Sequence, residues 1–148
     1  MKNIMFLFVL IGGLFFANSA AAQKNETESA KIPLNDYLQA HATGNPEFIR
    51  RAFYKEARIM AFRDGKLTSL SVEEFAGRFN GKAADDEANR KRTIESLDIS
   101  GNAGIAKIVL DYPAIKFVDY MSLLKIDGEW KIVNKSFYAE PKKQPLNK

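Results

Sequence analysis

Four polar residues interrupt two apolar runs near the end of the chain, in the segment FVDYMSLLKIDGEWKIVNK. They are Asp119, Tyr120, Asn134 and Lys135. A carboxylate, a phenol and an amine are groups that enzymes use for proton transfer and that binding sites use to orient a ligand. The same residue types also occur on the solvated side of an ordinary sheet. Their chemistry therefore depends on how the two runs pair.

The pair Asp127-Gly128 is typical of a two-residue hairpin turn, which predicts that Ile126 lies opposite Glu129. In that register Tyr120 lies opposite Lys135, close enough for the two side chains to interact. Asp119 precedes Tyr120 directly, so in a regular strand the two point to opposite faces and form no local dyad.

The predicted Tyr120–Lys135 pair has two interpretations. A lysine that is partly buried has a lowered pKa and can act as a base or as an anion receptor. Alternatively, its stem packs and its ammonium reaches solvent or the Tyr120 hydroxyl. For Asp119 we expect a structural bond to strand or dimer partners, because an unpaired buried group costs about 1–3 kcal/mol or more.

The remaining candidates are weaker. His41, the only histidine, shares a helix face with Tyr37 and is expected at the rim of that helix. With one histidine and no cysteine, no metal site is expected, and no cofactor motif is present. Arg92 and Tyr112 are candidates either for the mouth of a cavity or for a structural role. No catalytic residue is assigned.

Helices are predicted in the first half of the chain. Pro33 and Gly44 suit the start and end of one helix, and Asn45-Pro46 suits the cap and first turn of a second. Within LSVEEFAGRF, Ser71 and Glu74 form a capping box that predicts a short third helix. Residues 80–89 are small and charged, which predicts a mobile loop.

Strands are predicted elsewhere. Residues 56–63 alternate toward a turn at Asp64-Gly65, and apolar alternation continues through 91–100, 104–112, 115–126 and 129–138. Helices followed by a run of antiparallel strands predict an α+β domain with its helices packed on one face of the sheet.

The termini are predicted to lie outside this fold. Residues 1–22 have a positive start, a 14-residue apolar run and Ala20/Ala22, which together predict a signal peptide and hence an exported, periplasmic or extracellular protein. The run is too short for a stable membrane anchor. We expect a flexible leader at 23–31, one domain at 32–140 and a frayed tail at 141–148.

The net charge of the chain and the apolar faces of the predicted hairpin indicate which binding partners to expect. The net charge of +4 includes no concentrated basic face, so no nucleic-acid partner is expected. Both faces of the predicted hairpin are substantially apolar, whereas a sheet with one wet face alternates more cleanly. We therefore expect a homodimer through the sheet, with the helices covering the other face.

The stretches YLQAHATGNPEFIRRAFYKEARI, LSVEEFAGRF, RTIESLDISGNAGIAKIVLDYP and DYMSLLKIDGEWKIVNK together resemble the bacterial "putative lumazine-binding" proteins of the nuclear transport factor 2-like superfamily. The resemblance covers nearly all of the chain after the signal peptide. It implies a cone-shaped fold, in which a curved antiparallel sheet and the helices packed in it surround a cavity. Proteins with this fold are commonly dimeric. It assigns no catalytic residue, and the fold hosts enzymes, binding modules and scaffolds alike.

Three functions follow. The first is an exported domain that binds a small hydrophobic or aromatic ligand in its cone, without catalysis. The second is a cofactor-independent isomerase or dehydratase, which would require Asp119 or Asp111 inside the cavity near a tyrosine. The third is a structural dimerisation domain. The residues expected to line the cavity are Tyr120, Lys135, Val133, Phe137, Phe53 and Phe75.

Overall fold

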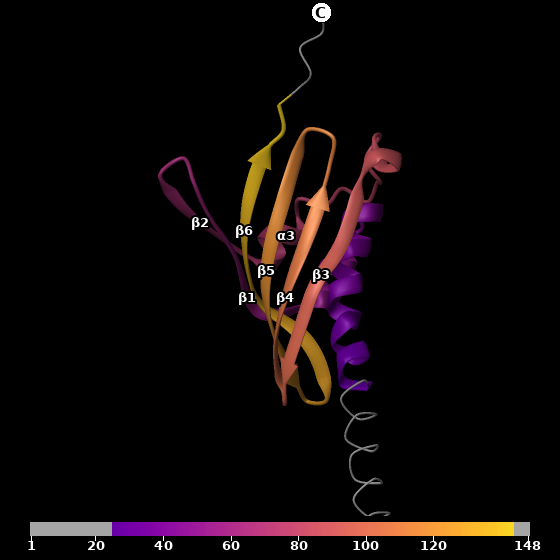
Figure 1. Ribbon diagram of the computed structural model, residues 1–148, viewed down its shortest axis with the longest axis vertical. Coiled ribbons are helices and arrows are strands. Elements are labelled where there is room, and N and C mark those ends of the chain that lie inside the picture. The colour runs from indigo at the N-terminus through magenta and orange to yellow at the C-terminus, as the bar shows by residue number, and fades with distance from the viewer. Residues whose placement is uncertain (1–24, 144–148) are drawn as a thin grey trace, which may run out of the picture.

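A computed structural model describes residues 25–143 of the chain (Figure 1). The described chain is helical through residue 43, in what we call the N-terminal helix. The elements that follow are α2 (Pro46–Ala52), β1 (Phe53–Arg63), β2 (Lys66–Ser71), α3 (Val72–Ala76), a short 3₁₀ helix η1 (Glu87–Asn89), β3 (Lys91–Ser100), β4 (Ala103–Asp111), β5 (Ile115–Ile126) and β6 (Glu129–Pro141).

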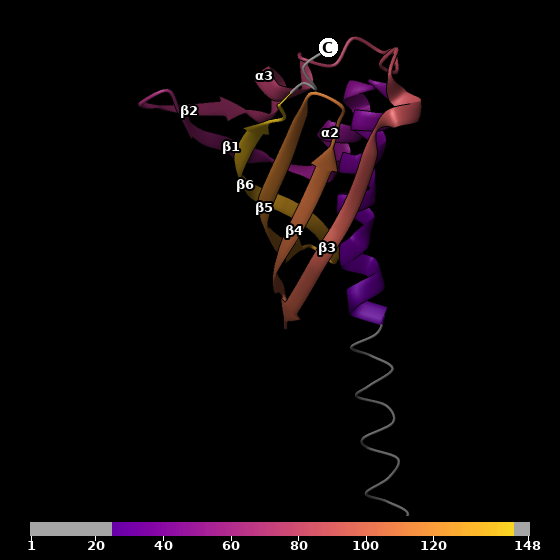
Figure 2. The same cartoon turned by 45° about the horizontal axis from the view of Figure 1, so that its top comes forward.

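The six strands form one sheet in the order β2-β1-β6-β5-β4-β3. Neighbours pair antiparallel, except that β1 and β6 run parallel and so join the first and last strands of the domain. Two views show the curved sheet with the N-terminal helix along the β3 side and the β1–β2 hairpin flaring away on the other (Figures 1 and 2). The predicted α+β architecture is confirmed, with one parallel pair added.

Local signals account for the two short helices. Asn45 caps α2 by accepting from the Glu47 amide, with Pro46 at the first helical position. Ser71 caps α3, and the Glu74 side chain accepts in return from the Ser71 amide at 2.7 Å, so the predicted capping box is present. A cap of this kind stabilises a helix by about 1 kcal/mol.

The predicted flexible leader is wrong for the part of it that the structure describes. Residues 25–31 are helical, and Ala30 is fully buried. Glu26 accepts from Lys125 Nζ at 2.7 Å and from Trp130 Nε1 at 3.1 Å. Polar composition suggested disorder, but this segment docks on the β5–β6 turn through a paired carboxylate and a buried small residue. The predicted signal peptide lies outside the described residues.

A β-bulge divides the β5–β6 hairpin. Near the turn the predicted register holds, with Ile126 opposite Glu129 and Leu123 opposite Ile132. Beyond it Ser122 pairs with Asn134, so Val133 is an extra residue on β6. The predicted pairing of Tyr120 with Lys135 is therefore wrong: Tyr120 lies opposite Ser136 and Lys135 opposite Met121. A one-residue shift moves every following side chain to the other face.

The core lies between the inner face of the sheet and the helices. It unites residues from the N-terminal helix, α2, α3 and the four strands β1, β4, β5 and β6; its fully buried members include Leu34, Tyr37, Ile49, Ile59, Ile108, Leu110, Met121, Leu123 and Ile132.

The C-terminal end of the described chain is hydrogen-bonded to the sheet region. Pro141, predicted to begin a frayed tail, still belongs to β6, and the Lys142 amide donates to the Ala114 carbonyl at 2.9 Å.

None of the helices in the described part of the chain combines the length and the apolar character that a membrane crossing requires.

Candidate functional site

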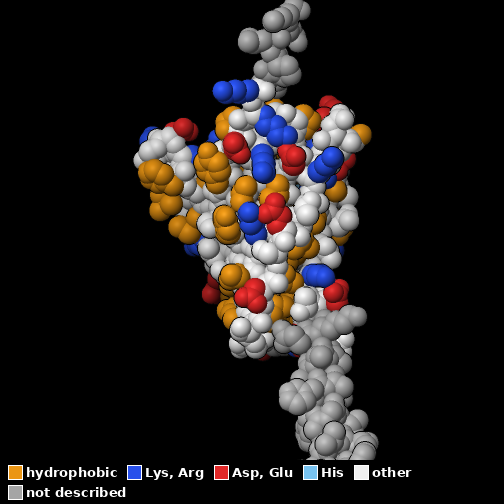
Figure 3. All heavy atoms as spheres, viewed as in Figure 1, with side chains coloured by type: hydrophobic (Ala, Val, Ile, Leu, Met, Phe, Trp, Pro, Cys, Tyr) orange, Lys and Arg blue, Asp and Glu red, His pale blue; other side chains and the backbone are white. Residues whose placement is uncertain are grey.

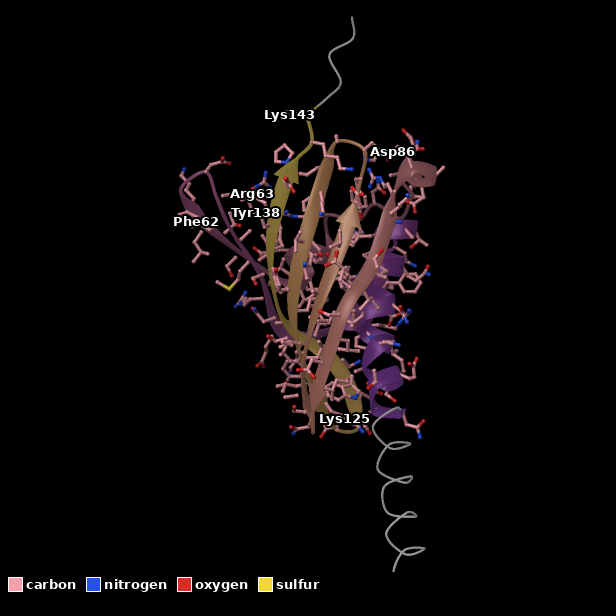
Figure 4. The ribbon with its side chains drawn as sticks, viewed as in Figure 1. Phe62, Arg63, Asp86, Lys125, Tyr138 and Lys143 are labelled. Atoms are coloured by element: carbon pink, nitrogen blue, oxygen red, sulfur yellow. The ribbon has the colours of Figure 1, made fainter. Side chains whose placement is uncertain are left out.

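A cavity of about 850 Å³ opens at the end of the cone where the loop between α3 and β3 lies. Its apolar wall is built from four phenylalanines contributed by α3, the loop after it, β5 and β6: Phe75, Phe79, Phe117 and Phe137. Arg63 at the end of β1 and Asp86 beside η1 mark opposite sides of its mouth (Figure 4). A cavity of this size and lining is typical of a small-molecule site.

The loop that forms one wall is tied to the N-terminal helix at Gly44. Gly44 has φ +71°, and a Cβ there would lie 2.0 Å from the Lys82 carbonyl oxygen. The Gly81 amide donates to the Gly44 carbonyl at 2.8 Å. Glycine is therefore required at this position both by the backbone conformation and by the close approach of the loop.

Arg92 ties down the other end of the same loop. Its guanidinium bonds both Glu87 carboxylate oxygens, at 2.6 and 2.7 Å, and donates to the His41 carbonyl at 2.9 Å. A planar guanidinium that grips a carboxylate with two bonds orients both partners. Arg92 therefore fixes η1 against the helix that carries His41.

Lys135 is the charged group on the cavity floor, and it belongs to a buried chain of three polar residues. Its Nζ donates to Tyr37 Oη at 2.5 Å, and Tyr37 in turn donates to Asp119 Oδ2 at 2.6 Å. The ammonium also lies 3.2 Å from Asp119 Oδ1, an ion pair that lacks the alignment of a hydrogen bond. Lys135 is 4% exposed, and Tyr37 and Asp119 are fully buried.

The bulge at Val133 explains why Lys135 is on this face at all. In the unbroken register it would share the outer face with Tyr120, whereas the extra residue turns it inward beside Met121 and Asp119. Bulges commonly re-aim side chains near functional sites. Tyr37 reaches the pair from the N-terminal helix, 82 positions away in sequence from Asp119.

Aromatic rings enclose the ammonium. Lys135 Nζ lies 4.8 Å from the ring centroids of both Tyr37 and Phe137, and 5.1 Å from that of Phe75. Ring faces attract a cation, most strongly where water is excluded. The rings and Asp119 thus favour the charged amine that burial alone opposes.

Burial dominates the acid–base properties of this group. Loss of solvation lowers the pKa of Lys135, and the Asp119 carboxylate partly offsets that effect. Burial, followed by the negative charge of Asp119, raises the pKa of Tyr37 well above its ordinary value. Tyr37 is therefore a phenol at neutral pH, a hydrogen-bond donor to the carboxylate.

His41 also lines the cavity. Its Nδ1 lies 3.2 Å from Tyr112 Oη, which accepts from Arg92 Nε at 3.3 Å. Its Nε2 is buried and has no hydrogen-bond partner in the part of the chain that the structure describes. Burial, and then the charges of Lys135 and Arg92, hold the pKa of His41 well below 6.5, so the imidazole is neutral at pH 7.

Cations predominate at the mouth. Arg63, Arg78, Lys82 and Arg90 line it together with two carboxylates, and one of these, Asp86, accepts from Arg90 at 2.7 Å. Fields from such a rim attract anionic ligands.

The six residues predicted to line the cavity separate into three groups. Lys135, Phe75 and Phe137 do line it. Phe53 is a core residue behind it, with its ring centroid 6.2 Å from that of Phe75. Tyr120 is 55% exposed on the outer face, and Val133 lines a shallow groove there with Leu124.

Sequence reasoning missed the connection among Tyr37, Asp119 and Lys135. A usable signal was present, because Tyr37 and His41 lie four residues apart on one helix face and their rings are in contact. The expectation that Asp119 must have a bonded partner is confirmed, although the partner comes from the helix. Asp111, the other carboxylate considered, pairs instead with Lys142 near the surface.

Solved structures with similar folds include NTF2-like proteins of unknown function. One from Shewanella baltica OS155 has a TM-score of 0.72 and 25% sequence identity, covering 80% of this chain and 96% of its own. Another from Methylobacillus flagellatus KT has a TM-score of 0.68 and 29% identity, covering 78% and 93%. A curated relative named aldolase FrzH, from Cladobotryum sp, is 23% identical over 109 residues, which are 72% of this chain and 85% of the relative.

The fold and its open-mouthed cavity thus define an NTF2-like α+β domain. The profile of the family described as "Putative lumazine-binding" matches residues 25–138, and the chain belongs to that family.

Proposed function

We propose that this protein is an exported domain that binds a small, planar, largely apolar molecule in its cone cavity. The observation that carries the proposal is the aromatic wall of an 850 Å³ cavity with two polar groups, Lys135 and His41, on its floor. Ligand sites typically combine such a lining with a few polar anchors. The family description makes lumazine one candidate ligand.

The ring contacts support a planar ligand. Phe79 meets His41 and Phe75 edge to face, with ring centroids 5.1 and 5.4 Å apart, and Phe117 lies 6.1 Å from Phe137. Rings in these arrangements present faces and edges that a further ring can join. The third function considered, a purely structural domain, requires the cavity to be filled by its own side chains.

Titration calorimetry with lumazine, riboflavin and 2-naphthol tests the proposal. The expected result is saturable binding of at least one ring compound, weakened about tenfold or more by Phe137→Ala, since a lost aromatic contact and its buried area together exceed about 1.4 kcal/mol. Phe62→Ala is the matched control, because Phe62 is 71% exposed on the outer face. Failure of every ring compound to bind contradicts the proposal.

A second candidate is a cofactor-independent enzyme that acts on a hydrophobic carbonyl compound. Two observations favour it: the relative named an aldolase, and the buried hydrogen bond between Tyr37 and Asp119. That bond meets the requirement of a carboxylate near a tyrosine, but Asp119 is shielded from the cavity by its own partners. Lys135 is the member of the chain that lines the cavity and can touch a substrate.

Turnover separates the two candidates. An aromatic β-hydroxyketone whose retro-aldol cleavage releases a fluorescent naphthaldehyde is a suitable substrate. The enzyme hypothesis expects cleavage that saturates with substrate and is abolished by Lys135→Met but retained in Lys131→Met, since Lys131 donates to the Arg51 carbonyl near the surface. Binding without cleavage supports the first candidate.

We also propose that the domain is a homodimer through the outer face of its sheet. Phe62, Leu67, Ile105, Tyr120 and Tyr138 are each 55–71% exposed there. Figure 3 shows hydrophobic side chains over the β1–β2 hairpin and among charged groups along the strands. Exposed apolar groups gathered on one face are typical of an interaction surface.

A further inference from the structure

The N–H donors of Lys135, on the cavity floor, can be matched one by one to the acceptors around them. The Lys135 ammonium has three N–H bonds. One donates to Tyr37 and a second faces Asp119 Oδ1 at 3.2 Å, which leaves the third without an acceptor among residues 25–143. Because Lys135 lines the cavity, that third donor is available to a ligand there.

The tautomer of His41 follows from its neighbour. Tyr112 Oη accepts from Arg92 Nε, and its own hydrogen has one acceptor among the described residues, His41 Nδ1. A neutral imidazole that accepts at Nδ1 carries its hydrogen on Nε2. The buried and unpartnered Nε2 is therefore an N–H donor. An unsatisfied buried donor is unfavourable, and a ligand oxygen would satisfy it.

The two donors lie near each other. The Tyr37 ring centroid is 4.7 Å from that of His41 and 4.8 Å from Lys135 Nζ, so the imidazole and the ammonium flank one ring. Burial is the main cause of the lowered pKa of His41, and the positive charge of Lys135 is the next, so the two groups are within electrostatic range of each other. One small ligand can therefore reach both groups.

Among the described residues, Lys135 and His41 give the cavity floor two donors, and no carboxylate lies beside them in its lining. Asp119, which accepts from Tyr37 and is ion-paired with Lys135, is fully buried and is not among the residues that line the cavity, so a ligand cannot reach its carboxylate. Arg90, on the loop side of the cavity, adds positive charge near His41. A ligand oxygen that carries negative charge is matched by these groups, whereas a neutral hydroxyl would bring a hydrogen with nowhere to donate.

We propose that the cavity is an oxyanion receptor, which binds the phenolate or enolate form of an acidic ring or carbonyl compound in preference to the neutral form. Lys135 Nζ and His41 Nε2–H are its two donors. The inference rests on the proposed ligand-binding function and names the chemical class of the ligand. It applies equally to a binding protein and to an enzyme that stabilises an enolate.

The probe is para-nitrophenol, whose phenolate absorbs visible light and whose neutral form does not, and para-nitroanisole is its non-ionisable counterpart. With the probe held about one pH unit below its solution pKa, added protein is expected to increase the phenolate band. The phenolate should bind at least tenfold more tightly than para-nitroanisole, which corresponds to a fall of about one unit in the pKa of the bound probe.

Variants assign the donors. Lys135→Met should abolish the phenolate preference while para-nitroanisole still binds, and Lys131→Met should leave it unchanged. His41→Asn retains a polar group toward Tyr112 but does not reach the Nε2 position, and should reduce the preference several-fold. Should Lys135→Met fail to fold, the His41 variant and the ¹⁵N chemical shifts of the His41 ring, which distinguish the Nε2–H tautomer, test the proposal independently.

The outcomes are distinct. Equal binding of the two probes with no growth of the phenolate band overturns the oxyanion receptor but leaves the proposed function standing. A His41 ring protonated at Nδ1 removes His41 from the receptor and overturns the two-donor site. If neither probe binds, the result contradicts the proposed function together with this inference.

Discussion

The β5–β6 hairpin has two halves, which are separated by one extra residue, Val133, and which differ in strand register. Next to the turn, Leu123, Trp130 and Ile132 point inward, as simple alternation predicts. Beyond Val133 the register is shifted, so within β6 Lys135 lies on the inner face and Tyr138 on the outer. The half near the turn is an ordinary core, and the half beyond the bulge is a polar site within that core.

The difference between these halves shows how a β-bulge can turn a charged side chain to the buried face of a sheet. Lys135 would be solvated in the regular register and is buried only because β6 has an extra residue. A buried ammonium is strongly unfavourable unless it is paired and hydrogen-bonded. Asp119 and Tyr37 supply that pairing, so the bulge and the polar chain depend on each other.

Replacing Lys135 by alanine breaks the comparison directly and should have the largest effect. The substitution leaves the fully buried Asp119 carboxylate without its counter-charge and opens a space among the rings of Tyr37, Phe75 and Phe137. The expected loss exceeds about 4 kcal/mol of unfolding free energy, as in other substitutions that strand buried charge. Urea unfolding followed by circular dichroism measures it.

The control is Val133→Ala, which retains the bulge and removes only a half-buried side chain. It should cost about 1 kcal/mol or less. If the Lys135 and Val133 variants are equally stable, the buried ammonium does not stabilise the half of the hairpin beyond the bulge.

Replacing Asp119 by alanine should have the next largest effect, because it leaves Lys135 buried without its counter-charge. Breaking one partner of a buried ion pair costs about 3–5 kcal/mol. Asp111→Ala is the matched control, since Asp111 pairs with Lys142 where both side chains are partly exposed, and should cost about 1 kcal/mol or less. Chemical denaturation of both variants provides the measurement.

The double variant Asp119→Leu with Lys135→Met sharpens the result. Replacing both charges by apolar groups of similar volume should recover much of the stability lost in Asp119→Ala. A double variant as unstable as the single one would show that shape, rather than charge, is what the site requires.

Acidification should destabilise the fold through His41 by a smaller amount. Its pKa in the folded protein is depressed below 6.5, so between that depressed value and 6.5 the unfolded chain binds more protons than the folded one. Stability is therefore fully present above about pH 6.5 and falls as the pH is lowered, by at most about 1.4 kcal/mol per pH unit for one proton. Thermal unfolding between pH 7 and 5.5 detects this slope.

His41→Asn is the control for this pH effect and should flatten the profile in that range. Glu26, Glu74 and Glu87, whose pKa values are lowered from 4.5 by their partners, lose their contributions only at lower pH. A slope that survives in the His41 variant assigns the effect to some other group.

The smallest effect on folding is expected from Tyr120→Ser on the outer face. Tyr120 is 55% exposed, so the unfolding free energy of the monomer should change by less than about 0.5 kcal/mol. If the homodimer forms through this face, the same change should raise the dimer dissociation constant about tenfold, in sedimentation equilibrium. A monomeric wild-type protein at micromolar concentration contradicts the proposed dimer.

Much of the fold was predictable because its signals are local. The capping box at Ser71 and Glu74, the cap at Asn45 and the turn at Asp127-Gly128 each involve residues within a few positions of one another. The family resemblance extended these elements to the correct architecture. The leader was predicted wrongly because Glu26 obtains its stabilisation from Lys125, 99 positions away, which composition cannot show.

The candidate site was only partly predictable. Lys135 was recognised as an unusual residue and a potential anion receptor, but it was assigned the wrong partner. Its partners, Tyr37 and Asp119, were separately noted without being connected. Nothing in the order of residues around Val133 marks it as the extra one, since a bulge is a property of two paired strands rather than of either alone.

By itself the sequence determined which segments form helices, strands and turns, because caps, glycine turns and alternating apolar residues act over distances of a few residues. The tertiary structure decided which side of the sheet Lys135 faces, which carboxylate and phenol accompany it, and that His41 Nε2 has no hydrogen-bond partner among residues 25–143. The physical reason is that a buried charge is tolerated only where distant groups converge to pair it, and only the packed fold specifies that convergence.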